Sequence, residues 1–185
     1  PDAVEDPKIG LIAADIDIPD YAQQLNVQLK DNSGVKEFID SRNAQLVEIG
    51  ERLKATGLNV LFCSRELHPA IIEHLAAHNI YAVRRVRRSD MEALAKATGA
   101  RIVMNIDTFS DKDLGASDLL EEVSIGERPM IKITGTPNKS TVSVLVRAPT
   151  HHVVEEIKRA FDDAIGVVSI AVEDQSVVPG GGAPY

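Results

Sequence analysis

Short apolar runs alternate with amphipathic stretches through the middle of the chain. The runs at 8–14, 59–63 and 80–86 are typical of strands, because they are short, apolar and bounded by polar residues or glycine. Between them, the segments 35–55 and 67–78 carry apolar residues at the three- and four-residue spacing of a helix face. This alternation of strand and helix favours an α/β fold.

The pattern continues with a third, shorter helix. Ser89 and Glu92 fit a capping box, which predicts a helix start, and Gly99 stands where a left-handed C-cap would end that helix after Thr98. The segment 110–120 is expected to be a loop with one helical turn. Further strands are predicted at 25–29, 102–104, 122–125, 130–134 and 141–147.

A long amphipathic helix is predicted from a Thr150 cap to about Val172. Its apolar stripe consists of Val153, Val154, Ile157, Phe161, Ala164, Ile165 and Val168. We therefore expect an α/β domain of about 140 residues, closed by an extra strand pair, with a helix of about twenty residues leading out of it.

Composition and net charge exclude several classes of function. The 185 residues carry a formal net charge of −8, which argues against general nucleic-acid binding. No apolar run approaches the length that spans a bilayer, so no membrane partner is expected. The single cysteine excludes an internal disulfide and suits a reducing compartment, so a cytoplasmic location is predicted. Arginines at 84, 85, 87 and 88 are interpreted as salt-bridge partners or an inter-subunit contact beside a core strand.

Metal and thiol chemistry are not expected. His74 and His78 have the spacing of a helical ligand pair, with His68 nearby, but no HExxH motif occurs and no third ligand follows at a telling distance. The sequence therefore predicts no metal site. Cys63 lies at the end of a core strand and is interpreted as a buried, inert thiol.

Three glycines, Gly180, Gly181 and Gly182, follow an apolar pair close to the last residue, Tyr185. Because glycine has no Cβ, such a segment can approach a ligand or a neighbouring helix closely. A motif of this kind at the very end of the chain suggests a piece of a larger protein.

Several blocks of the sequence resemble group II chaperonin subunits, the archaeal thermosomes and their eukaryotic cytosolic relatives. The segment 82–103, AVRRVRRSDMEALAKATGARIV, is the most specific of them. The others are PKIGL at 7–11, ATGLNVLFC at 55–63, VLVR at 144–147, HVVEEI at 152–157 and VVPGGGAP at 177–184. The resemblance covers essentially the whole chain.

The resemblance implies three domains. Residues 1–139 would be the apical, substrate-binding domain, with a central sheet, flanking helices and a helical protrusion at about 31–55. Residues 140–176 would be a segment of the intermediate domain, and 177–185 the start of the equatorial, ATP-binding domain. The protein would then be a molecular chaperone that binds unfolded or partly folded proteins, supplies the built-in lid of an ATP-driven folding chamber and assembles with sibling subunits into a double ring.

Site residues follow from the same resemblance. The segment FDDAI at 161–165 matches the family's LHDAL, which places the water-activating aspartate at Asp163, with Asp162 as its neighbour and competitor. Gly180, Gly181 and Gly182 match nucleotide-contacting glycines. ATP and Mg²⁺ would be needed by the full-length protein only, because no GDGTT-like phosphate loop occurs here, and this chain alone should not hydrolyse ATP.

The resemblance to group II chaperonins also implies that clients bind in a groove between the helices at 35–55 and 67–78. The candidate groove residues are Leu67, Ile71, His74, Leu75 and His78. The alternative is that Ile71, Ile72 and Leu75 simply pack the second helix on the sheet.

The chain also departs from the family. LHPAIIEHLAAHNI at 67–80 differs from the usual second-helix sequence, and RAPT at 147–150 replaces RGGT, which indicates a divergent paralogue. Two further functions remain open. One is a structural or oligomerisation module without general client binding, and the other is a stand-alone small α/β enzyme or ligand-binding protein.

Overall fold

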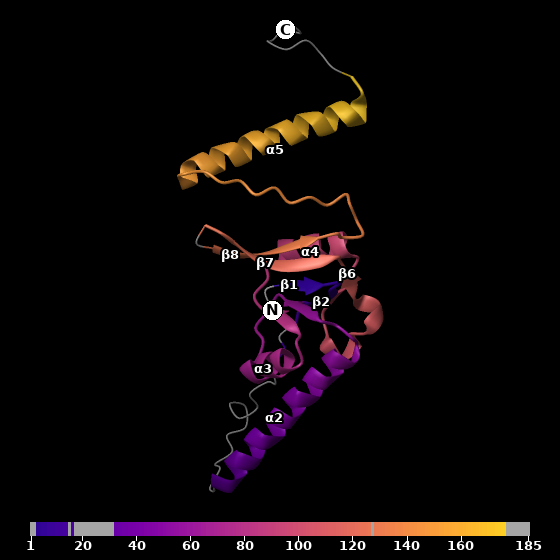
Figure 1. The fold of residues 1–185 in the computed structure, drawn as a ribbon, viewed down its shortest axis with the longest axis vertical. Coiled ribbons are helices and arrows are strands. Elements are labelled where there is room, and N and C mark those ends of the chain that lie inside the picture. The colour runs from indigo at the N-terminus through magenta and orange to yellow at the C-terminus, as the bar shows by residue number, and fades with distance from the viewer. Residues whose placement is uncertain (1–2, 15, 17–31, 127, 177–185) are drawn as a thin grey trace. The chain divides into compact units, whose positions relative to one another are not determined.

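A computed structural model describes residues 3–14, 16, 32–126 and 128–176, with the side chains of 32–43 left out of the description. The chain divides into two compact units, Pro1–Thr141 and Val142–Tyr185. Figure 1 shows the helices and strands of both units. The predicted strand at 25–29 lies outside the described residues.

The first unit is built on a mostly parallel sheet. Its strands are β2 (Lys8–Ile12), β3 (Val60–Cys63), β4 (Tyr81–Val83) and β5 (Ile102–Val103), in the spatial order β4-β3-β2-β5. The short strand β6 (Gly115–Ala116) pairs antiparallel with the start of β2. These parallel pairings confirm the predicted α/β class.

Strand β3 shows why the strands of the parallel sheet appear in the sequence as continuous apolar runs. All four of its residues are buried, because layers cover the sheet on both faces. Leu61 and Cys63 pack on the side of the first two helices, whereas Val60 and Phe62 pack on the opposite side with Met91. Successive side chains of a strand point to opposite faces, so one short run contributes to two clusters.

The described residues of this unit also form the helices α2 (Asn32–Ala55), α3 (Pro69–Ala77) and α4 (Arg88–Thr98). The imidazole of His68 caps α3 by accepting a hydrogen bond from the amide of Ala70. Gly99 ends α4 with a φ of 76°, as predicted. The predicted capping box is wrong, because Arg87 occupies the N-cap position without a side-chain hydrogen bond and Ser89 already lies in the first turn.

A second, antiparallel sheet has the order β1-β7-β8 and consists of β1 (Ala3–Glu5), β7 (Leu119–Ile125) and β8 (Arg128–Thr134). It confirms the extra strand pair. Before β7, the segment 110–120 contains the single-turn 3₁₀ helix η2 (Asp111–Asp113), which confirms the one helical turn predicted there, and a further 3₁₀ turn, η1 (Ile106–Thr108), precedes it. The Ser110 hydroxyl and amide both donate to the Asp113 carboxylate in η2, a capping box that the sequence analysis missed.

The second unit contains the long helix α5 (His151–Asp174). The Thr150 hydroxyl accepts a hydrogen bond from the amide of Val153, which confirms the predicted cap. The predicted strand at 141–147 is wrong, because this segment has no regular secondary structure. Its polar and apolar residues alternate, but no described strand pairs with it, and an unpaired strand leaves its backbone groups unsatisfied. Within the described residues, no helix is long and apolar enough to cross a membrane.

Candidate functional site

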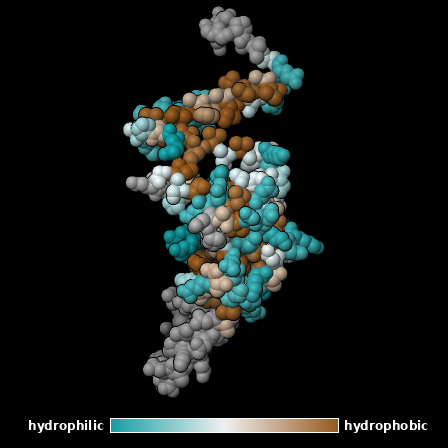
Figure 2. All heavy atoms as spheres, viewed as in Figure 1, coloured by the Kyte–Doolittle hydropathy of each residue, from teal (hydrophilic) through white to brown (hydrophobic). Residues whose placement is uncertain are grey.

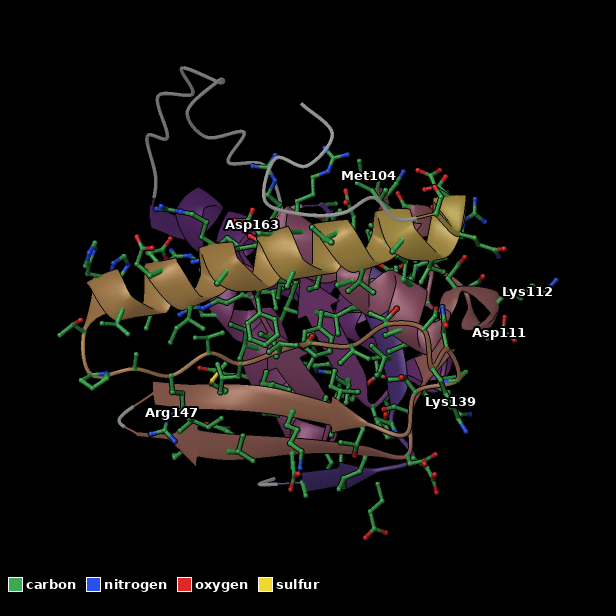
Figure 3. All side chains as sticks on the ribbon, turned by 90° about the horizontal axis from the view of Figure 1, so that it is seen from above. Met104, Asp111, Lys112, Lys139, Arg147 and Asp163 are labelled. Atoms are coloured by element: carbon green, nitrogen blue, oxygen red, sulfur yellow. The ribbon has the colours of Figure 1, made fainter. Side chains whose placement is uncertain are left out.

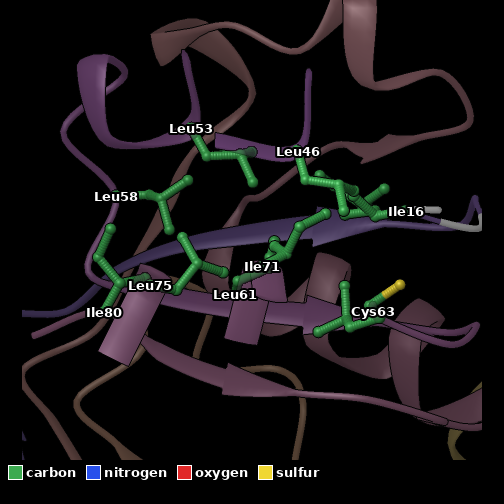
Figure 4. Packing of buried hydrophobic residues seen from close by; sticks show 11 residues of the cluster. Ile16, Leu46, Leu53, Leu58, Leu61, Cys63, Ile71, Leu75 and Ile80 are labelled. Carbon is green, nitrogen blue, oxygen red and sulfur yellow. The ribbon is translucent and has the colours of Figure 1, made fainter. Parts of the chain in front are cut away.

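The contact between α2 and α3 is closed by apolar side chains. Ile71 and Leu75 of α3 are 0% exposed, and Leu67, which precedes the helix, is 1% exposed. Ile71 and Leu75 pack in one cluster with Leu46 and Leu53 of α2, as Figure 4 shows. Leu67 belongs to the same cluster. Leu67, Ile71 and Leu75 therefore do not face an open groove, and the structure corrects their assignment as client-binding residues. The alternative, that they pack α3 in the core, accounts for them.

The other two predicted groove residues, His74 and His78, lie at the rim of this contact. Their side chains are 15% and 29% exposed, and the centroids of their rings are 4.5 Å apart. Glu51 of α2 meets both of them. Its Oε1 atom is 3.3 Å from Nε2 of His74 and 3.8 Å from Nε2 of His78.

Glu51 is a functional candidate that the sequence analysis missed. No third ligand follows the histidine pair at a telling distance along the chain. The third group comes from an earlier helix, and its carboxylate lies with the two imidazoles in a cluster that could hold a metal ion. Spacing along one helix cannot reveal a ligand that a neighbouring helix contributes.

A glycine explains how closely the two helices approach. Gly50 lies in α2 directly before Glu51, where glycine costs about 1 kcal/mol relative to alanine. A Cβ atom on Gly50 would lie 2.3 Å from Cδ2 of His74, which is far inside van der Waals contact. The missing side chain therefore lets the imidazole of His74 pack against the backbone of α2.

An arginine-lined cavity of about 630 Å³ lies at the carboxyl ends of the parallel strands. Such crevices are the usual ligand-binding position in open parallel sheets. The cavity is lined by Ala13, Ser64, Arg65, Arg85, Val86, Arg87, Arg88, Met91, Glu92, Ile102 and Met104.

Two of the four arginines that line this cavity, Arg85 and Arg88, are paired with carboxylates. Arg84 and Arg85 both donate hydrogen bonds to the carboxylate of Glu66, and Arg88 donates to Glu92. The hydrogen bond from Arg85 is the main cause that holds the pKa of Glu66 below its ordinary value, and Arg84 lowers it further. The salt-bridge interpretation of this arginine run is thus confirmed for these three arginines.

Cys63 is buried, as predicted, and its thiol donates a hydrogen bond to the carbonyl oxygen of Ala14 at 3.2 Å. The side chain lies in the same cluster as Leu61 and Ile71. Burial among apolar groups fits a structural cysteine better than a nucleophile.

In the second unit, α5 is exposed along its length. Phe161 and Ile165 line a shallow cavity of about 350 Å³ together with Val144, Val146, Val154, Lys158 and Asp162. Asp163 does not line this cavity. It follows Phe161 by two residues, about 200° around the helix, and therefore lies on the opposite face (Figure 3).

The helix face that carries Asp163 is charged on its N-terminal side, where Arg159 pairs with Glu156, and apolar on its C-terminal side. Val167 and Ile170 follow Asp163 at the i+4 and i+7 positions, and both are exposed. The Asp163 carboxylate forms no hydrogen bond or ion pair with the described residues. Gly180, Gly181 and Gly182, the other predicted nucleotide-site residues, lie outside the described part of the chain.

Similarity to known protein families identifies the family to which this chain belongs. The family model described as TCP-1/cpn60 chaperonin matches residues 1–185. The chain belongs to this chaperonin family. The resemblance noted from the sequence blocks is therefore confirmed.

Individual relatives agree with the family match. This chaperonin-family chain is 41% identical to a thermosome subunit of Methanopyrus kandleri over 184 residues, 100% of its own length. It is 42% identical to a thermosome subunit of Methanocaldococcus jannaschii over 183 residues, 99% of its length. It spans 34% of each of these proteins, about a third.

A solved structure shows the same fold. The open-state monomer of a group II chaperonin from Methanococcoides burtonii superimposes with a TM-score of 0.77 and 32% sequence identity. The likeness covers 98% of this chain and 39% of that one. The fold of this family member is therefore that of the corresponding part of a group II chaperonin.

Proposed function

We propose that the chain is the client-binding part and the adjoining arm of a group II chaperonin subunit. Residues 1–139 would form the apical domain with α2 in its protrusion, 140–176 an intermediate-domain segment, and 177–185 the start of the equatorial domain. The observation that carries the proposal is the likeness to chaperonins along the whole chain, in sequence and in fold. The partners would be non-native proteins and sibling subunits of a ring.

The surface of the second unit supports this assignment. Figure 2 shows apolar residues gathered over α5. Between 166 and 172 the helix is apolar almost all round, a composition typical of helices that are buried on every side. The segment 142–147 alternates like a strand but has no described partner strand. We infer that other parts of a whole subunit cover both.

We propose that clients bind to the outer surface of the α2–α3 pair, since the apolar groove residues predicted from the sequence are buried. Val47 is an exposed apolar side chain of α2, 45% accessible, three residues before Gly50. His74 and His78 provide partly exposed rings on α3. Apolar contacts are non-directional, so a surface of this kind can accept many different unfolded sequences.

The test measures how well the isolated chain slows the aggregation of a thermally denatured protein, followed by light scattering. The effect of a single copy should be weak, because a ring can raise apparent affinity by about 10²–10⁴-fold. Val47→Asp should abolish the effect at an unchanged thermal midpoint. Met130→Asp, at an exposed apolar position of β8, is the matched control and should retain it. No suppression by the parent chain would favour the alternative, a structural or oligomerisation module.

For the whole subunit, we propose that Asp163 orients and deprotonates the water that attacks ATP. The carboxylate is exposed and unpaired among the described residues, so it is available to accept a proton from water. The apolar neighbours at 167 and 170 fit a face that meets another domain rather than bulk water. ATP with Mg²⁺ would supply the γ-phosphate, held by residues outside this chain together with Gly180, Gly181 and Gly182.

In the full-length subunit, Asp163→Ala should slow ATP hydrolysis by about 10²–10⁴-fold, the usual contribution of a general base. ATP affinity should stay nearly unchanged, because the carboxylate acts on the attacking water and not on the bound ground state. Asp162→Ala is the matched control and should hydrolyse ATP at close to the parent rate. The opposite result for the two variants would transfer the role to Asp162.

A further inference from the structure

We propose that Glu51, His74 and His78 form a binding site for a divalent transition metal, with Zn²⁺ as the preferred ion. The carboxylate comes from α2, the imidazole of His74 from α3, and the imidazole of His78 from the C-cap position that directly follows α3. Imidazole nitrogen and carboxylate oxygen are the ligands that zinc accepts in proteins. The site goes beyond the proposed chaperone function and does not depend on it.

The spacing of the ligand atoms fits a single ion. A tetrahedral zinc with ligand bonds of about 2.0–2.1 Å places its ligand atoms about 3.4 Å apart. Oε1 of Glu51 lies 3.3 Å and 3.8 Å from the Nε2 atoms of His74 and His78. The ligand atoms of the three residues all lie within 4.8 Å of one another. Three protein ligands leave the fourth position for water, so small side-chain movements would complete the coordination.

A backbone hydrogen bond sets the correct tautomer of His78. Its Nδ1 atom lies 2.8 Å from the carbonyl oxygen of His74. A carbonyl can only accept, so Nδ1 must carry the hydrogen, and the lone pair of a neutral ring is then on Nε2. Nε2 is the atom nearest to Glu51. Metal-bound histidines commonly donate their second ring N–H to a backbone carbonyl in this way.

His74 provides a second, independent observation. Its Nε2 atom is buried and forms no hydrogen bond with the described residues, and its polar neighbour is the Glu51 carboxylate, whose Oε1 lies 3.3 Å away. A buried polar atom without a partner is costly, and a cation between Nε2 and the Glu51 carboxylate would remove that cost. Close packing against Gly50 fixes the ring position, because the imidazole lies where a Cβ would be.

The competing occupant is a proton. A protonated His74 would form an ion pair with Glu51 and satisfy the same atoms without any metal. The two possibilities differ in their response to added zinc. A metal site takes up Zn²⁺ stoichiometrically, and the bound ion then links α2 to α3, whereas a protonated His74 does neither. Metal ligation requires neutral imidazoles, so the titration is run at about pH 7.5.

The experiment titrates the metal-free chain with ZnCl₂ in a non-chelating buffer by isothermal titration calorimetry, with thermal unfolding as the second readout. We expect one zinc per chain. At free zinc 100-fold above Kd, the thermal midpoint should rise by about 5–10 °C. Absence of binding heat together with an unchanged midpoint would support the proton and overturn the proposal.

Variants locate the bound ion. Glu51→Gln and His78→Gln should each weaken zinc binding at least tenfold and abolish the rise in midpoint. Glu51→Gln preserves shape at a half-exposed position, so it is expected to remain folded. The matched control is His151→Gln on α5, where His151 and Glu155 form a histidine–carboxylate pair at 3.9 Å. Zinc affinity that persists in Glu51→Gln, or that is lost in His151→Gln, would contradict a site between α2 and α3.

Discussion

Helices α3 and α5 carry similar apolar stripes and have opposite environments. In α3, Ile71 and Leu75 are completely buried against the sheet and α2. In α5, Phe161 and Ile165 are 46% and 55% exposed. An apolar stripe thus indicates that a helix face will be covered, but it does not say by which element.

The difference separates two kinds of apolar residue in one chain. Those of α3 stabilise the first unit by themselves, since their partners lie on β3 and α2 of the same unit. Those of α5 contribute little to the stability of the isolated chain, because they remain in contact with water. Substitutions at equivalent positions of the two helices should therefore have very different effects.

The largest effect is expected for Leu75→Ala. Truncating a fully buried leucine should lower the free energy of unfolding of the first unit by about 2–5 kcal/mol, through lost burial and the cavity that remains. Phe161→Ala on α5 removes a larger side chain but should change stability by no more than about 0.5 kcal/mol. Urea unfolding followed by far-UV circular dichroism measures both variants. Equal losses in the two variants would mean that α5 is covered within the chain.

Much of the fold could be predicted from the pattern alone. The buried runs at β2 and β3 are apolar throughout, and the caps at Gly99 and Thr150 use local chemistry that the sequence displays. The segment 141–147 was misassigned because alternation specifies a strand only when a partner strand is present. The capping box around Ser89 failed because α4 begins one residue before it, at Arg88.

The next largest effect is expected for Gly50→Ala. Alanine is favoured over glycine by about 1 kcal/mol in a helix interior. Here the added methyl group would lie 2.3 Å from the ring of His74, and we expect a net loss of about 1–3 kcal/mol from overpacking. Gly166→Ala on α5 is the control, since no atom lies within 4 Å of a Cβ at Gly166, and it should be neutral or stabilising.

The measurement is urea unfolding with a chelator present, so that metal binding does not contribute. Adding His74→Ala to Gly50→Ala should recover part of the loss, because the clashing ring is gone. A stabilised Gly50→Ala variant would show that α2 and α3 are further apart than described, and it would also weaken the proposed metal site.

The candidate sites were less predictable than the fold, for a physical reason. Leu67, Ile71 and Leu75 were placed in a groove by resemblance, but their burial depends on how α2 packs over α3. Glu51 was missed because its contact with His74 and His78 is formed by helices that are separated in sequence. The spacing of residues along one helix predicts neither the packing of α2 over α3 nor the contact of Glu51 with the two histidines.

The smallest effect is expected for Glu66→Gln, an exposed group in the unit with the strong core. Arg85 and Arg84 hold the pKa of Glu66 below its ordinary value of 4.5, so the ionised carboxylate stabilises the folded state. This contribution is complete above the ordinary pKa and is lost as pH falls through the lowered one. The midpoint difference between parent and Glu66→Gln should therefore be small and constant from about pH 8 to 5, and it should diminish progressively as the pH falls below the ordinary pKa. Glu156→Gln, which removes the partner of Arg159 on α5, is the matched surface control. A Glu66→Gln variant that is more stable than the parent between about pH 8 and 5 would mean that the arginines destabilise the ionised carboxylate, contrary to their hydrogen bonds.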